Sequence, residues 1–202
     1  MTGTDVDDTL LEAARALVTG EALGNVVLVH DDLFRSQLSP GAFDLVHARF
    51  EVAPLGRADE QLAASQHLVA PGGWIVLEHP DASSWHFNPP APAAERLIAL
   101  CLAAFLAAGG DFDAGRREAE LLRGVGLEPE VRAEVLALPP GHPYLRLPLQ
   151  FSVSLEPRLL RLVSAAELAR LRQAAGTEIA DPSRWGTTFA LIQTWAKVPR
   201  SS

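Results

Sequence analysis

The stretch of sequence that decides the fold is His67-Leu68-Val69-Ala70-Pro71-Gly72-Gly73-Trp74-Ile75-Val76-Leu77-Glu78. It predicts the end of a helix, a tight Pro-Gly-Gly turn and a short strand that ends in a carboxylate. Proline fixes one backbone angle and cannot continue a helix, whereas paired glycines accept positive φ angles without a steric penalty. The uninterrupted apolar run at residues 74–77 is typical of a strand that is covered on both faces of a parallel sheet. The stretch therefore predicts an α/β protein.

Length and composition limit the class of protein. The chain has 202 residues, 48% of them apolar and 21% charged, which suits one folded domain with a full hydrophobic core. Its net charge of −8 argues against a nucleic-acid groove or an anionic membrane surface as partner. The single cysteine, Cys101, excludes an internal disulfide and lies in an apolar helical run, which favours a core position over a nucleophile.

Targeting signals are not visible in the sequence. The N-terminus is polar and acidic, unlike a signal peptide. The longest apolar run, at residues 97–108, is too short to cross a bilayer and is typical of a buried helix. We therefore expect a cytoplasmic protein without a membrane partner.

Strands and helices alternate along the chain. Strands are expected at residues 26–29, 43–50, 74–77, 131–138 and 188–198. Helices are expected from Asp8 or Thr9 to Gly20, and at about 58–68, 93–108, 114–123, 145–163 and 165–176, the last behind the capping box Ser164-Ala165-Ala166-Glu167. This alternation predicts a doubly wound, mostly parallel sheet with right-handed crossovers.

Carboxylates follow the early strands of this pattern. Ligands of doubly wound sheets bind beyond the carboxyl ends of the strands. Asp5 is placed to accept two ribose hydroxyls, although it could equally be a carboxylate that stabilises the start of the next helix. Asp32 suits the exocyclic amine of a base, with the Leu33 amide donating to a ring nitrogen. A solvated turn is the alternative for Asp32, and Asp31 is an equivalent candidate.

Four motifs in order resemble a known family. They are Thr-Gly-Thr-Asp-Val-Asp at residues 2–7, Val-Leu-Val-His-Asp-Asp-Leu-Phe at 27–34, Gly-Ala-Phe-Asp-Leu-Val-His-Ala-Arg-Phe at 41–50 and Leu-Val-Ala-Pro-Gly-Gly-Trp-Ile-Val-Leu-Glu at 68–78. From residue 2 to about 81 the chain resembles the class I S-adenosylmethionine-dependent methyltransferases, and the remainder matches them more loosely.

The resemblance implies a fold and a domain organisation. The fold would be a Rossmann-like, mostly parallel sheet with an antiparallel terminal strand and a helical lid at about residues 139–163. Residues 1–202 would form one domain, with 1–81 on the cofactor side of the sheet and 82–202 on the substrate side.

The resemblance also implies an activity and its binding residues. Methyl transfer from S-adenosylmethionine to a small-molecule acceptor is expected, with oxygen, nitrogen and carbon acceptors all open. Asp5 would bind the ribose, Asp32 and Leu33 the adenine. His47, Ala48 and Arg49 would border the methionine moiety.

Histidines near strand ends are candidates for a general base, because imidazole titrates near neutral pH. Of His47, His79, His86 and His142, the best candidate is His79 beside Glu78, at the end of a central strand; a surface or loop position is the alternative for each. His79, His86 and Asp81 lack the spacing of a metal site, so no metal is predicted.

Aromatic and polar side chains in the irregular segments are candidates for the acceptor pocket. Trp85, His86, Phe87 and Tyr144 are expected to line it, since apolar pockets with few polar groups bind small molecules. The alternative is that the aromatic residues fill a satellite core beneath the inserted helices.

The chain departs from the family pattern ahead of Asp5. The family's first strand and glycine-rich loop should precede this residue, yet only four residues do. The first two strands would then lack a central neighbour and expose unpaired backbone groups. Upstream coding sequence, a degenerate remnant or a paired assembly such as a homodimer would each explain this.

Two other functions compete with methyl transfer for this sequence. The chain could be a non-catalytic methyltransferase-like protein that acts through a partner subunit. A nicotinamide dehydrogenase shares the sheet but requires a glycine fingerprint, and the Pro-Gly-Gly strand argues against it.

Overall fold

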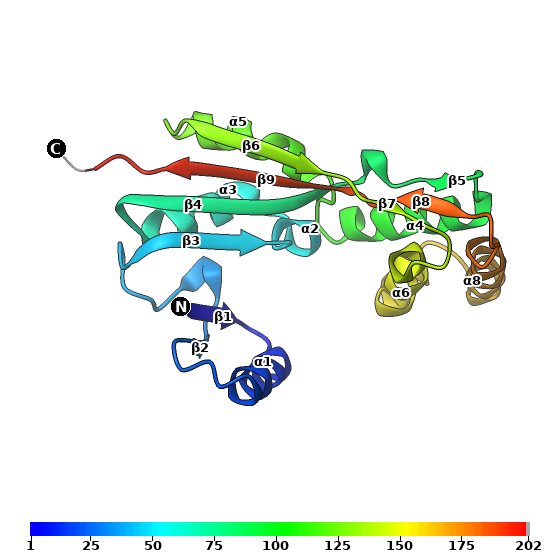
Figure 1. The fold of residues 1–202 in the computed structure, drawn as a ribbon, viewed down its shortest axis with the longest axis horizontal. Coiled ribbons are helices and arrows are strands. Elements are labelled where there is room, and N and C mark those ends of the chain that lie inside the picture. The colour runs from blue at the N-terminus through cyan, green and yellow to red at the C-terminus, as the bar shows by residue number, and fades with distance from the viewer. Residues whose placement is uncertain (201–202) are drawn as a thin grey trace. The chain divides into compact units, whose positions relative to one another are not determined.

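A computed structural model describes residues 1–200 and divides into two compact units. The first unit comprises Met1–Val46, Asp59–Ile75 and the residues from Lys197 onward, and the second comprises His47–Ala58 and Val76–Ala196. Three strands are shared between the units along the chain: β3 (Phe43–Arg49), β4 (Val69–Asp81) and β9 (Ala190–Lys197) (Figure 1).

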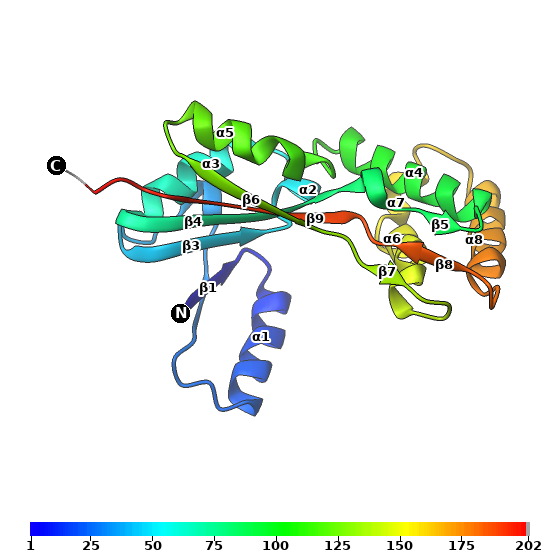
Figure 2. The same ribbon diagram turned by 45° about the horizontal axis from the view of Figure 1, so that its top comes forward.

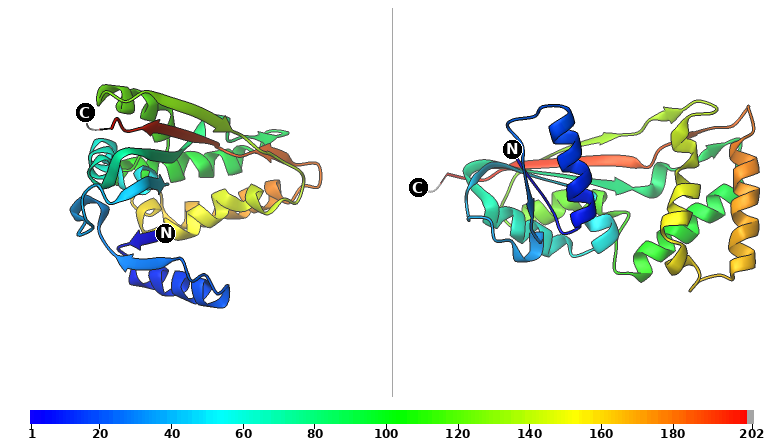
Figure 3. Two further views of the ribbon diagram at one scale, coloured as in Figure 1. Left: turned by 60° about the vertical axis from the view of Figure 1, so that its left-hand side comes forward. Right: turned by 90° about the horizontal axis from the view of Figure 1, so that it is seen from below.

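The first unit begins with a parallel βαβ arrangement. Strands β1 (Thr2–Asp5) and β2 (Val27–His30) pair from Thr2↔Val27 to Asp5↔His30. Helix α1 (Asp8–Gly20) connects them and lies alongside the pair (Figure 3). Within residues 1–200 these two strands form a sheet of their own.

The cap of α1 differs from the sequence prediction. Asp7, rather than Asp8 or Thr9, is the N-cap, and its carboxylate accepts the Thr9 N–H at 2.8 Å. The extended backbone of Asp7 directs its side chain back to the free N–H groups of the first turn, as capping requires.

The stretch that decides the fold runs from the first unit into the second, with its Pro-Gly-Gly segment in the first. The 3₁₀ turn η1 (Leu33–Arg35) and helix α3 (Ala58–Leu68) precede β4, which follows α3 without a gap. The predicted turn at Pro71-Gly72-Gly73 is wrong, because these residues belong to β4. The Gly72 N–H donates to the Val198 carbonyl at 3.0 Å, and the Val198 N–H donates to the Gly73 carbonyl at 2.9 Å. Pairing with the C-terminal segment thus keeps the glycines in a strand.

Antiparallel pairing joins β6 to β9 in the larger sheet. The four-stranded sheet has the order β3-β4-β9-β6, and β6 (Pro129–Glu134) pairs antiparallel with β9 from Pro129↔Ala196 to Glu134↔Leu191. The α/β class and the antiparallel terminal strand are therefore confirmed. The predicted strand at 131–138 is split into β6 and β7 (Ala137–Leu138), and β8 (Trp185–Thr187) is a short strand that lies just before the predicted strand at 188–198. Strands β7 and β8 pair in a smaller sheet of order β5-β8-β7, with β5 at Phe87–Asn88.

The second unit contains most of the helices (Figure 2), and α4 (Pro92–Ala107) and α8 (Ala165–Ile179) supply many of the residues of its hydrophobic core. The unit's other helices are α2 (Val52–Leu55), α5 (Glu118–Gly124), α6 (Leu147–Ser154) and α7 (Glu156–Leu159), with 3₁₀ turns η2 (Ala82–Ser84), η3 (Ala114–Arg117) and η4 (Pro143–Arg146). The predicted capping box is present at its Ser164 side, where the hydroxyl accepts the Glu167 N–H at 3.2 Å. Within residues 1–200, no helix combines the length and apolarity needed to cross a bilayer.

Candidate functional site

In the first unit, the predicted ribose and adenine residues meet at the carboxyl ends of β1 and β2. Parallel pairing places Asp5 opposite His30, and the Asp31 N–H donates to the Asp5 carbonyl at 3.1 Å. Asp32 follows directly. The structure therefore brings Asp5 and Asp32 to one edge of this small sheet.

Each of these two carboxylates uses one oxygen for a local turn. Asp5 Oδ1 accepts the Asp7 N–H at 2.8 Å, and Asp32 Oδ1 accepts the Phe34 N–H at 3.0 Å. Their other oxygens have no hydrogen-bond partner within residues 1–200, and a carboxylate has about four acceptor positions. Asp31 differs, since it is only 6% exposed and accepts the Gln37 N–H at 2.8 Å. Asp32 is thus the accessible residue of the two candidates.

A hollow lies beside Asp32. Its volume is about 570 Å³, within the range of small-molecule sites. It is lined by residues of η1 and its following turn and of α3: Leu33, Phe34, Arg35, Ser36, Gln37, Glu60, Ala63, Ala64 and His67. Two available carboxylate oxygens near a hollow of mixed polar and apolar lining fit a nucleoside.

In the second unit, a row of polar side chains crosses one face of β3, β4 and β9. Glu78 lies in the middle, with its Oε2 3.3 Å from Arg49 Nε and its Oε1 3.8 Å from His47 Nε2. Gln193 Nε2 donates to Glu78 Oε1 at 2.7 Å. The Glu78 side chain is 14% exposed, whereas those of His47 and Arg49 are 43% and 54% exposed. Ala48 is buried, as expected for a residue between two that share the open face.

Sequence reasoning missed Gln193. It is the one amide side chain in a terminal strand of otherwise apolar, hydroxyl and basic residues. The antiparallel pairing of β9 with β6, which the resemblance implied, could have drawn attention to it.

The chain turns sharply at the end of β3. Phe50 has φ +59°, a left-handed conformation that is unfavourable for a bulky residue. Its N–H donates to the Glu78 carbonyl at 3.0 Å. The Arg49 guanidinium lies 5.1 Å from the centre of the Phe50 ring, and the Phe189 ring meets that ring edge-on at 6.0 Å. An ion-paired arginine and an aromatic ring are therefore held together at this strand end.

His79 is at the centre of a buried network. Its side chain is 0% exposed, its Nδ1 contacts the Glu118 carboxylate, and its Nε2 accepts the Val52 N–H at 3.1 Å. Because Nε2 accepts, the ring proton belongs on Nδ1 and is donated to Glu118. The network joins β4, the start of α2 and the start of α5.

Burial changes the acidity of Glu118. It raises the pKa of the Glu118 carboxyl, and the hydrogen bond from His79 offsets only part of that effect. Glu118 Oε2 and Thr194 Oγ1 are buried atoms without a hydrogen-bond partner in residues 1–200.

The four residues predicted to line the acceptor pocket divide between core and surface. Trp85 and Phe87 are 3% and 5% exposed and belong to the hydrophobic core, so their placement in a pocket wall is corrected. The Trp85 ring packs against Phe112, Phe151 and Phe189 at centroid distances of 6.1, 5.8 and 5.5 Å. Trp85 directly follows the 3₁₀ turn η2, and this turn leads the chain into the core.

The other two residues predicted for this pocket lie at the surface. The exposed His86 ring bonds the Ser83 carbonyl at 2.8 Å, and the exposed Tyr144 packs edge-on against His142. The structure does not gather the four into one wall.

The surroundings of Asp81 and Cys101 shift the pKa values of these two side chains. Burial alone raises the pKa of Asp81, but hydrogen bonds from Arg116 and Ser83 bring it below its ordinary value. Cys101 is fully buried in α4, which raises the pKa of its thiol to about 12. No cluster of potential metal ligands is present in residues 1–200.

No protein-family model matches the sequence, and no curated protein matches it either. Several solved structures do. A candidate methyltransferase of Bacillus halodurans is similar with a TM-score of 0.62 at 13% identity, over 98% of this chain and 82% of its own. The YcgJ protein of Bacillus subtilis has a TM-score of 0.60 at 12% identity, over 100% and 82% of the two chains.

A third similar structure contains a cofactor product and a substrate. The geranyl diphosphate C-methyltransferase of Streptomyces coelicolor, in complex with geranyl diphosphate and S-adenosylhomocysteine, has a TM-score of 0.52 at 13% identity, over 97% of this chain and 62% of its own. At these identities the likeness concerns the fold, and it confirms the Rossmann-like class. The chain has the fold of the S-adenosylmethionine-dependent methyltransferases.

Proposed function

We propose that the protein transfers a methyl group from S-adenosylmethionine to a small molecule. The observation that carries this proposal is the pair of available carboxylates, Asp5 and Asp32, at the carboxyl ends of two parallel strands in a methyltransferase-like fold. Nucleotides bind at this place in doubly wound sheets.

The first unit supplies the groups that would hold the nucleoside. Asp5 would accept the ribose hydroxyls through the oxygen that its turn leaves available. Asp32 would accept the adenine amino group, and the Leu33 N–H would donate to a ring nitrogen. The hollow beside Leu33 has room for the base.

The second unit supplies the groups expected near the reaction. The bound cofactor supplies a methyl group on a sulfonium, which an acceptor displaces in line. Orientation and exclusion of water contribute most to such a reaction. His47, Ala48 and Arg49 are assigned to the border of the methionine moiety, and Glu78 keeps His47 and Arg49 oriented through its ion pairs.

A proton must be removed only when the acceptor is an oxygen or carbon acid. We assign the removal of that proton to the exposed His47 imidazole, which lies 3.8 Å from Glu78 Oε1. His79 is assigned a positioning role, because its buried ring holds the Val52 N–H just after Arg49 and Phe50.

A non-catalytic function through a partner subunit is the second candidate. It is favoured by the small β1–β2 sheet, because β1 has β2 as its only paired strand within residues 1–200. An open strand edge can pair with another chain, including a second copy of this one.

Calorimetric titration with S-adenosylmethionine separates the two candidates. Wild type should release or absorb heat on binding, and Asp5→Asn should bind roughly tenfold more weakly, because a charged hydrogen-bond acceptor is lost. Asparagine retains an oxygen for the Asp7 N–H, so the turn is preserved. Asp44→Asn, a change of equal charge at an exposed position of β3, is the matched control and should bind as wild type does. Absence of heat at millimolar cofactor would exclude the catalytic proposal.

A further inference from the structure

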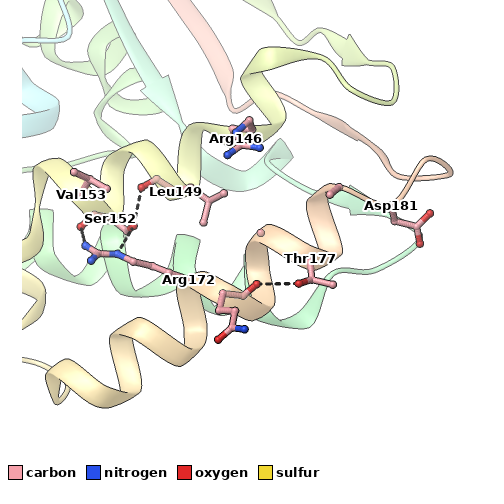
Figure 4. A pocket seen from close by; sticks show the side chains of 10 residues that line it. Arg146, Leu149, Ser152, Val153, Arg172, Thr177 and Asp181 are labelled. Carbon is pink, nitrogen blue, oxygen red and sulfur yellow. Dashed lines mark hydrogen bonds between the residues drawn. The ribbon is translucent and has the colours of Figure 1, made fainter.

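A second hollow lies in the second unit, between α6 and α8 (Figure 4). Its volume is about 920 Å³, within the range of sites for small organic ligands. It is lined by Arg146, Leu149, Ser152, Val153, Arg172, Gln173, Gly176, Thr177, Ala180 and Asp181. None of the residues assigned to methyl transfer is among them.

The middle of the hollow is apolar. Leu149 and Ala180 face it from α6 and from the end of α8, and Gly176 leaves space between them. A Cβ atom added at Gly176 would meet no atom within 4 Å. Val153, on the next turn of α6, is 65% exposed and extends the apolar surface. This surface would suit the body of an apolar ligand.

Arg146 brings an exposed positive charge to the hollow. Within residues 1–200 its guanidinium has neither a hydrogen-bond partner nor an ion-pair partner. Asp181 also lines the hollow, but its carboxylate is already engaged, since its Oδ1 accepts the Ser183 N–H at 2.8 Å and the Ser183 hydroxyl at 2.7 Å (Figure 4). Arg146 is therefore free to bind an anion.

Arg172 is fixed in place, and its charge is balanced by an ion pair with Glu156. Its Nε donates to Ser152 Oγ at 2.9 Å and its Nη1 donates to Glu156 at 2.7 Å. A third donor reaches the Ser152 carbonyl. The bonds to Ser152 tie α8 to α6 and the bond to Glu156 ties α8 to α7, so the two walls of the hollow are joined in the folded protein.

The local charge is opposite to that of the whole chain. Residues 143–184 contain six arginines and four carboxylates, whereas the chain as a whole carries −8. A segment with a net positive charge on an acidic protein attracts anions more than the rest of the chain does.

We propose that the α6–α8 hollow binds an amphipathic anion, with its carboxylate on Arg146 and its apolar chain over Leu149 and Ala180. Such a ligand satisfies the free guanidinium and covers the apolar surface at the same time. The proposal goes beyond methyl transfer and does not depend on it, because binding here requires no cofactor.

Octanoate is the probe, measured by calorimetry with the full chain and no S-adenosylmethionine. Octanoate should bind wild type, whereas 1-octanol and inorganic phosphate at the same millimolar concentration should bind at least tenfold more weakly. Arg146→Gln should weaken octanoate binding roughly tenfold, the effect of losing one charge-assisted hydrogen bond. Arg161→Gln, an equal charge change at an exposed arginine outside the hollow, is the control and should bind as wild type does.

A second variant tests the cavity itself. Gly176→Leu places a side chain into the open space and should abolish octanoate binding without unfolding α8, because leucine is a better helix former than glycine. Circular dichroism checks the fold of each variant. The proposal is overturned if octanoate does not bind folded wild type, if Arg146→Gln and Arg161→Gln bind it alike, or if folded Gly176→Leu binds it as well as wild type.

Discussion

At the residue scale, Glu118 is the most unusual ionisable group of the second unit. It is buried, one of its oxygens lacks a partner within residues 1–200, and burial raises its pKa above the ordinary value of 4.5. The folded protein therefore holds this proton more tightly than the unfolded chain does. The resulting stability is fully present below pH 4.5 and is lost as the pH rises through the raised pKa of the folded state.

Glu118→Gln should remove this pH dependence. Glutamine keeps an acceptor for the His79 Nδ1–H but cannot ionise. Free energies of unfolding, measured in urea from pH 4 upward, should fall for wild type relative to the variant as the pH rises. Parallel curves for the two proteins would show that the carboxyl does not titrate differently on folding.

Substitutions of Phe50 test whether the backbone is strained at the end of β3. Its φ of +59° is costly for any residue with a Cβ atom, alanine included. Both Phe50→Ala and Phe50→Gly remove the ring, so their difference isolates the backbone. We expect the glycine variant to be more stable by about 1 kcal/mol in urea unfolding. An alanine variant of equal or greater stability would argue against strain at this position.

At the element scale, two glycines should respond to alanine in opposite directions. At Gly73 in β4 a Cβ would lie 2.8 Å from the Asp44 carbonyl oxygen and 2.9 Å from that of Ala70, both backbone atoms. Gly73→Ala should therefore destabilise the protein, by about 2 kcal/mol or more. Gly176→Ala, within α8 and in open space, should stabilise it by about 1 kcal/mol. Urea unfolding of both variants measures the contrast, and equal effects would contradict the packing around β4.

Periodicity and capping signals were sufficient to predict most elements but not their pairing. The apolar run at residues 74–77 identified β4, yet the Pro-Gly-Gly segment became strand because Val198, far away in sequence, bonds to it. Asp31 and Asp32 are adjacent and chemically identical. The hydrogen bond from the Gln37 N–H to the Asp31 carboxylate distinguishes the buried Asp31 from the accessible Asp32. Trp85 follows a loop-like sequence, and its burial depends on three distant aromatic rings. Such long-range contacts leave no signal in the nearby sequence.

At the scale of the whole molecule, the nucleoside residues and the residues of the α6–α8 hollow belong to different compact units. The nucleoside residues Asp5 and Asp32 lie in the first unit, and the α6–α8 hollow lies in the second. A ligand that binds only the folded protein stabilises it in proportion to the logarithm of its concentration. Protection of backbone amides from hydrogen exchange then reports where the ligand binds, because each segment of the chain opens with its own free energy.

Hydrogen exchange should therefore give two distinct footprints. S-adenosylmethionine should slow amide exchange in residues 2–5 and 27–35, which contain β1, β2 and η1, and in residues 47–49 at the end of β3. Octanoate should slow exchange in residues 146–154 and 172–181, where the walls of the second hollow lie. Mass spectrometry of peptides from wild type, Asp5→Asn and Arg146→Gln assigns each footprint to its residue, since each variant should lose one footprint and keep the other. Loss of both footprints in either variant would mean that the two sites are not independent, and protection by octanoate at β1 and β2 would place its binding site in the wrong unit.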